Sequence, residues 1–158
     1  MGYRTITMPA LDELTELLKQ SSLFGGLDNP SITRLHNLLE CGQAEAGECI
    51  RPRGDNNPAL YLIQSGRIQL RMTGNPVPIA DLRRGQSFGL LSILFPGEAF
   101  TEACAVETST FIVLDSSTMR MLEISNPQLA LLVLRSIRIE LAPLINQALP
   151  VIARTCLK

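Results

Sequence analysis

Apolar and polar residues follow three successive patterns along the chain, and the first pattern is helical. Residues 11–18 place leucines at helical spacing, with acidic Asp12 and Glu13 in the first turn, where a helix favours negative charge. A second helix is predicted to begin at residues 29–31 and to be stopped by Gly42. The chain therefore opens with two predicted helices.

The middle of the chain has a period of two, which indicates strands with one buried face. Residues 67–72 alternate strictly, and Ser65-Gly66 separates them from the apolar residues 60–64, so a tight hairpin is predicted there. Further strands are predicted at 77–82, 102–106 and 110–114. Short strands separated by turn residues are typical of an antiparallel barrel or jelly roll.

The helical period returns after the last predicted strand. Ser116 or Ser117 is predicted to cap a short helix that ends at Asn126-Pro127, and a long apolar helix follows. Pro143 and Pro150 predict a kink or break in that helix, because each proline removes a helical hydrogen bond.

The long helix is apolar on more than one side, so we expect one face to lie on the barrel and another on a partner. A second copy of the chain and a different protein fit the pattern equally well. The residues of its heptad-like seam are Leu134, Ile137, Leu141, Leu144, Ala148 and Val151. A second apolar set lies at residues 132, 139, 145, 149 and 152.

Composition excludes several classes of function. The 158 residues are 46% hydrophobic, which suits one domain with a sizeable core, and the net charge of −1 gives no overall attraction to nucleic acid or anionic membranes. Aromatic residues make up 4% with no Trp, which leaves few stacking platforms for single-stranded nucleic acid. The single histidine, His36, cannot build a metal site that needs two or three imidazoles. With no nucleophile–base pair visible, we predict a protein that is not an enzyme and needs no metal or cofactor.

The cysteines and the N-terminus bear on the compartment. Cys41, Cys49, Cys104 and Cys156 have no metal-binding or framework spacing and are interpreted as small apolar residues in a reducing compartment. The first residues lack the apolar core of a signal peptide, and the longest apolar run, 129–134, is too short to cross a bilayer. A cytoplasmic protein without membrane insertion is predicted.

Arginines outnumber acids between residues 50 and 84, where Asp55 and Asp81 are the acidic residues. They form either a patch for an acidic partner or the solvated outer face of the sheet, and we favour the second interpretation. The arginines are Arg51, Arg53, Arg67, Arg71, Arg83 and Arg84.

Two glycine-punctuated stretches are more specific than a generic barrel. The first runs from Gly47-Glu48-Cys49-Ile50 through Gly54-Asp55 to residues 60–70, and the second is residues 82–89, ending Ser87-Phe88-Gly89. Together they resemble the cyclic nucleotide-binding domain family of catabolite activator proteins, kinase regulatory subunits and gated channels. The resemblance covers about residues 20–142. It implies a mainly β fold, an antiparallel jelly roll (double-stranded β-helix) with N-terminal helices and a long C-terminal helix, which packs against its twin in dimeric members.

The resemblance also implies a ligand cassette after Gly89, made of a loop and short helix that hold the cyclic phosphate. The family places an acid after the glycine to hold the ribose, and further on an arginine for the phosphate, small residues and Ser or Thr. Here Leu90 stands at the acid's position and Ala99 at the arginine's, and no Lys or Arg lies between Arg84 and Arg120. The candidate cassette residues are Gly89, Leu90, Leu91, Ser92, Ala99, Phe100 and Thr101.

The cassette is therefore predicted to be degenerate, with Leu90 either filling a vacated pocket or adapted to an apolar ligand. Gly89 either holds a phosphate loop or only closes a turn. We divide the chain into an N-terminal helical extension (1–20), a jelly-roll domain with its C-terminal helix (21–142) and a helical extension after Pro143 (143–158).

Two functions compete on this basis. One is a regulatory or protein-interaction module, predicted to be a homodimer, that does not bind cyclic AMP or cyclic GMP in the standard way. The other is a genuine sensor of a cyclic nucleotide or other small ligand that signals through the C-terminal helix. Direct DNA binding is not expected, because the two family helices occupy most of the chain after Asp115 and a further domain needs roughly 50 residues.

Overall fold

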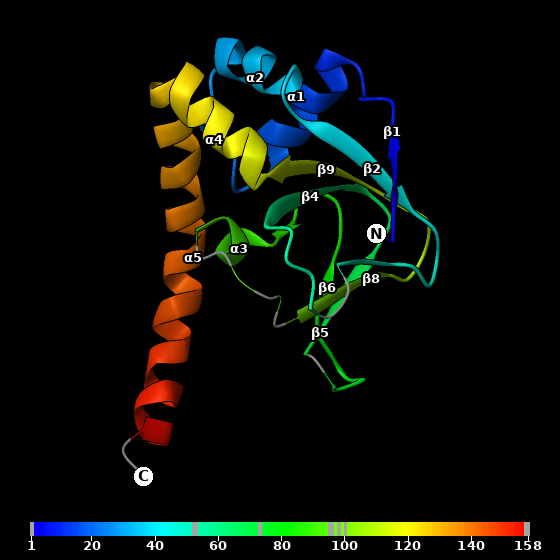
Figure 1. The fold of residues 1–158 in the computed structure, drawn as a ribbon, viewed down its shortest axis with the longest axis vertical. Coiled ribbons are helices and arrows are strands. Elements are labelled where there is room, and N and C mark those ends of the chain that lie inside the picture. The colour runs from blue at the N-terminus through cyan, green and yellow to red at the C-terminus, as the bar shows by residue number, and fades with distance from the viewer. Residues whose placement is uncertain are drawn as a thin grey trace.

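Two antiparallel sheets form the centre of the molecule (Figure 1). The computed structural model describes residues 2–51, 54–72, 74–94, 97, 99 and 101–156. The five-stranded sheet has the order β1 (Arg4–Ile6), β2 (Glu40–Ala44), β9 (Ser109–Asp115), β4 (Ala59–Ser65) and β7 (Ser87–Phe88). The four-stranded sheet has the order β3 (Cys49–Arg51), β8 (Thr101–Ala105), β5 (Ile68–Met72) and β6 (Pro78–Leu82).

Helices cover one side of the five-stranded sheet (Figure 1). The five-residue α3 lies directly after β7, and α4 and α5 follow β9. Together with the antiparallel sheets they confirm the predicted mainly β fold with flanking helices. The helices are α1 (Leu11–Gln20), α2 (Asn29–His36), α3 (Leu90–Leu94), α4 (Ser116–Ser125) and α5 (Pro127–Cys156).

The five-stranded sheet separates two apolar clusters, which explains the unbroken apolar run of β4. Leu60 and Leu62 face the helices, whereas Tyr61 and Ile63 face the four-stranded sheet, because successive side chains of a strand point to opposite faces. Phe111 of β9 is completely buried in the cluster between the sheets. The helix-side cluster includes leucines of α1, so residues 1–20 contribute to the core as well as providing β1.

The predicted hairpin at Ser65-Gly66 is wrong. The strands before and after it belong to different sheets, since β4 pairs with β7 and β9 while β5 pairs with β6 and β8. Gly66, with φ +89°, is the point where the chain crosses between the sheets. A side chain there would overlap Ser109, so the glycine permits a close crossing and not a two-residue hairpin turn.

Asp115 caps α4 in place of the serines that the sequence suggested. Its carboxylate accepts a hydrogen bond from the Thr118 amide at 2.7 Å, and Asp28 likewise caps α2 by accepting from the Ser31 amide at 2.9 Å. Gly42 does not end the second helix. It lies in β2, where the absent side chain leaves room for the Phe111 ring.

The helix α5 continues through Pro143 and Pro150, so the predicted break is absent. Both prolines are at exposed positions, where water can satisfy the carbonyl groups that lose their helical partners. Within the described residues, no helix combines the length and the apolar character needed to cross a membrane.

Candidate functional site

Gly89 joins β7 to α3 and lies against the backbone of β4. Its φ is +83°, and a Cβ at this position would overlap the carbonyl oxygen of Ala59 and lie 3.4 Å from Nη1 of Arg51. The glycine is therefore required by its surroundings as well as by its backbone conformation. Its neighbours show which side chains meet at the cassette.

The predicted cassette residues are distributed over different environments. Leu90 is buried in the helix-side cluster, which supports the interpretation that it fills space, whereas Leu91 is exposed. Ser92 is buried, with a hydroxyl that accepts a hydrogen bond from Nη2 of Arg51. Ala99 is buried and donates its amide to the carbonyl oxygen of Asp55 at 3.2 Å.

The remaining two cassette residues contribute less. Thr101 begins β8 opposite Met72, and Phe100 lies outside the described residues. The structure thus brings Gly89 and Ser92 together with a residue that was not assigned to the cassette, Arg51.

Arg51 contradicts the prediction that the arginines of residues 50–84 form a solvated outer face. Cys49 pairs with Cys104, but the register then shifts, and Arg51 pairs with Ala103, whose side chain is buried between the sheets. Such a β-bulge re-aims the side chain that follows it. Arg51 therefore points inward, and only 6% of its surface is exposed. Strict alternation from Cys49 would have placed it outside.

The guanidinium of Arg51 lacks a full set of partners. Its Nε–H is buried and has no hydrogen-bond acceptor. Among the described residues the ion pairs are Arg4–Glu45 and Arg67–Asp81, so Arg51 has no carboxylate partner there. A buried cation without an opposite charge is costly, which makes Arg51 the most unusual charged group near the cassette.

Aromatic rings line the same interior. The ring of Tyr61 stacks on Phe88 at 4.7 Å and meets the edges of Tyr3 and Phe111. Burial raises the pKa of the Tyr61 hydroxyl, and the neighbouring Tyr3 and Asp55 raise it further, while the positive charge of Arg51 lowers it. Both Asp55 and Arg51 thus lie within electrostatic range of Tyr61.

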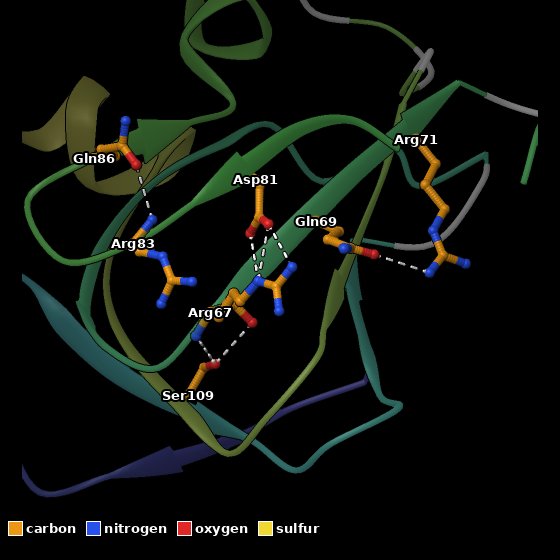
Figure 2. A network of polar contacts seen from close by, with 7 residues as sticks. All are labelled: Arg67, Gln69, Arg71, Asp81, Arg83, Gln86 and Ser109. Carbon is orange, nitrogen blue, oxygen red and sulfur yellow. Dashed lines mark hydrogen bonds and ion pairs between the residues drawn. The ribbon is translucent and has the colours of Figure 1, made fainter. Parts of the chain in front are cut away.

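Arg67 and Arg83 fit the solvated-face interpretation better (Figure 2). Arg67 of β5 forms a bidentate ion pair with Asp81 of β6, with Nε–Oδ1 at 2.7 Å and Nη2–Oδ2 at 2.5 Å. This hydrogen bonding holds the pKa of the Asp81 carboxyl below its usual range. Arg71 is partly buried: it donates to Gln69 at 3.2 Å, and its buried Nε–H, like that of Arg51, has no acceptor. Figure 2 draws no hydrogen bond or ion pair from the side chain of Arg83. Arg53 lies outside the described residues.

The interpretation of the four cysteines as isolated small residues is wrong for two of them. Cys49 and Cys104 are paired across β3 and β8, with Cα atoms 3.9 Å apart, and form a disulfide. Residues 55 apart in sequence become neighbours only through the strand pairing, so their spacing carries no signature. Cys41 is a buried free thiol, and burial raises its pKa.

His36 has the structural role expected of it, since its Nε2 lies 3.0 Å from the carbonyl oxygen of Pro9. Among the residues that the structure describes, no group of His, Cys, Asp and Glu is placed to hold a metal ion. A groove of about 730 Å³ lies where α2 meets the junction of α4 and α5, lined by Arg34, Leu38 and Leu122 among others. None of the predicted cassette residues lines it.

The three residues of the predicted partner seam whose side chains the structure describes face the molecule's own core instead. Ile137 and Leu141 are buried in the helix-side cluster, and Leu134 packs against it. The side chains of Leu144, Ala148 and Val151 lie outside the described residues. Large apolar side chains on the other side of α5 are exposed instead: Leu131, Leu132 and Ile139.

The chain is similar in sequence to known proteins. The cyclic AMP receptor protein of Thermus thermophilus is 33% identical over 100 residues, which are 61% of this chain and 46% of the relative. The cAMP-dependent protein kinase regulatory subunit of Yarrowia lipolytica is 25% identical over 120 residues, which are 76% of this chain and 32% of the relative. The chain thus spans less than half the length of either protein.

The fold of one solved structure matches that of this chain over nearly the whole length of the chain. A cyclic nucleotide-binding domain from Methylobacillus flagellatus has a TM-score of 0.80 at 19% identity, covering 98% of this chain and 89% of its own. This likeness confirms the fold. Residues 42–125, more than half of the chain, match the family model described as cyclic nucleotide-binding domain. On the strength of that match and of the sheet order, the cassette position and the C-terminal helix, the chain belongs to the cyclic nucleotide-binding domain family.

Proposed function

We propose that this chain is a non-enzymatic regulatory or protein-interaction module that does not bind cyclic AMP or cyclic GMP in the standard way. The observation that carries this proposal is Leu90. Where the family resemblance places a ribose-binding acid, the Leu90 side chain is packed into the helix-side core. The absence of any Lys or Arg between Arg84 and Arg120 supports the same conclusion for the phosphate.

Calorimetric titration with cyclic AMP, cyclic GMP and cyclic di-GMP tests this proposal. Leaving a buried charge without its partner costs about 3–5 kcal/mol, so affinity should be lower by roughly two to three and a half orders of magnitude than with an intact cassette. Loss of the ribose acceptor weakens binding further. A micromolar dissociation constant for any of the three would instead favour the alternative, a genuine ligand sensor that signals through α5.

The proposed output is homodimerisation through the exposed face of α5. Leu132 and Ile139 are 42% and 65% exposed and lie seven residues apart, the spacing at which a helix presents the same face. Burying such side chains contributes about 1.5–3 kcal/mol each. The family resemblance supports a copy of the same helix as the partner, and a different protein remains the alternative occupant.

Replacing Leu132 and Ile139 together by Glu should dissociate the dimer while leaving the fold intact. Four charges would enter the interface of a symmetric dimer, so the dissociation constant should rise by at least about 100-fold. Sedimentation velocity across a concentration series measures this change.

A matched control is Met121→Glu with Ile124→Glu on α4, where two apolar side chains are also exposed but lie off the proposed interface. The control should sediment as the unmodified protein does. A monomer at tens of micromolar for the unmodified chain would contradict the homodimer.

The cytoplasmic location inferred from the sequence stays a prediction. Structural disulfides are rare in the cytosol of most organisms, so the Cys49–Cys104 bond argues for testing the location directly. Fractionation of cells, with the thiols of the chain trapped on lysis, reports both the location and the state of that bond.

A further inference from the structure

We infer that Arg51 and Ser92 form the polar end of a binding site for a small oxyanion of the phosphate class. The inference rests on the proposed function and deepens it, because it names the class of ligand that the site could bind without the arginine of the family's cassette. The cation comes from β3, which precedes the cassette in the sequence and is separated from it by β4, β5, β6 and β7.

The Arg51 side chain is buried without enough partners for its charge and its donors. It is 94% buried, given an exposed fraction of 6%, yet the structure shows no carboxylate within ion-pair distance among the described residues. Its Nε–H has no acceptor, although a guanidinium has five N–H donors arranged as a planar fork. A bound oxyanion would satisfy both the charge and the unused donor, and bidentate recognition of such anions is the characteristic chemistry of arginine.

The Arg51 guanidinium lies beside the cassette. Nη2 donates to the hydroxyl of Ser92 on α3, and Nη1 lies 3.4 Å from where a Cβ of Gly89 would be. The Ser92 hydroxyl can donate its own hydrogen to an anion while it accepts from the guanidinium. Ser92 is 7% exposed, so neither member of the pair is completely sealed from solvent.

A merely structural role for Arg51 fits its surroundings poorly. Arg51 lies opposite Ala103 in a cluster of apolar and aromatic side chains, where an aliphatic residue would pack without any loss of solvation. Asp55, whose charge is felt at Tyr61 together with that of Arg51, forms no ion pair with it. A bound anion would neutralise this desolvated charge.

Thermal unfolding in increasing inorganic phosphate tests the inference, with Arg51→Met as the variant and Arg83→Met as the matched control. Both changes remove one positive charge, but Arg83 is exposed. Phosphate stabilises most proteins weakly through solvent effects, and the control measures that contribution. The unmodified chain should gain more stability than Arg51→Met does, and Arg83→Met should behave as the unmodified chain.

In calorimetry, Arg51→Met should bind inorganic phosphate about 10- to 100-fold more weakly than the unmodified chain. This is the usual effect of losing charge-assisted hydrogen bonds. Arg51→Lys keeps the charge without the fork and should bind with intermediate affinity, which preserves the test if Arg51→Met does not fold. The Nε–H resonance of Arg51 should also shift when phosphate is added to the labelled protein. Equal phosphate responses of the unmodified chain and of both Arg51 variants would overturn the inference.

Cyclic AMP and adenosine separate this inference from the proposed function. Weak binding of cyclic AMP that matches that of phosphate, with none by adenosine, supports both. Micromolar binding of cyclic AMP that is lost in Arg51→Met contradicts the proposed function and supports the role of Arg51. Micromolar binding that survives in Arg51→Met contradicts both, and a phosphate response absent from the unmodified chain contradicts the role of Arg51 alone.

Discussion

Breaking the Cys49–Cys104 bond should lower the free energy of unfolding by about 4 kcal/mol, a value that follows from the entropy of closing a loop between residues 55 apart. The bond links β3 to β8, which are paired with each other in the four-stranded sheet. β3 is only three residues long and lies at the edge of that sheet, so it has few other contacts to hold it. Urea unfolding of Cys49→Ala with Cys104→Ala, compared with the oxidised protein, measures the loss.

The same double variant supplies the control. Reductant should destabilise the unmodified protein to the level of the variant and leave the variant itself unchanged. Cys41→Ala should respond to reductant as the unmodified protein does, because Cys41 is a free thiol. Four reactive thiols in the denatured, unreduced protein would contradict the presence of the bond.

Gly89→Ala should cost about 2–5 kcal/mol of stability, the second large effect expected. An L-residue at φ +83° costs about 1–2 kcal/mol, and the methyl group would overlap the Ala59 carbonyl oxygen, which adds about 1–3 kcal/mol for overpacking. The strand β4 cannot easily move away, since it is paired with both β7 and β9. Chemical denaturation measures the change.

Comparison with Gly47→Ala isolates the contribution of the overlap between a Cβ at position 89 and the Ala59 carbonyl oxygen. Gly47 has φ +89°, nearly the same conformation, but nothing lies within 4 Å of a Cβ built there. The Gly47 variant should therefore lose only about 1–2 kcal/mol, the conformational part. Equal losses at the two positions would mean that Gly89 is needed for its backbone conformation alone.

The pattern of residues predicted most of the fold because it reports local structure. Strict alternation at 67–72 identified β5, and leucines at helical spacing identified α1. Which strands pair is a property of the whole chain, however, and the short connection at Gly66 looked like a hairpin although it crosses between sheets. The same limit applies to the disulfide, since Cys49 and Cys104 meet only after β3 and β8 pair.

The candidate site could be predicted only in part for a related reason. The glycine turns and the family resemblance placed the candidate cassette at Gly89, and Leu90, predicted either to fill a vacated pocket or to meet an apolar ligand, lies in the helix-side cluster. Arg51 was missed because one irregularity in a three-residue strand reverses the face to which a side chain points. On α5, apolar residues cover more than one side, and periodicity alone did not distinguish Ile137, which is buried, from Ile139, which is exposed.

The shortness of α3 has a mechanical consequence. Within its five residues, Ser92 is tied to Arg51 on one side, and Leu90 is embedded among the residues that support α5 on the other. Two residues of a helix are separated by about 3 Å along its axis, less than one turn. A displacement of Ser92 is therefore expected to move Leu90 as well. In this way the short helix α3 connects the buried arginine to the helix proposed to join two copies of the chain.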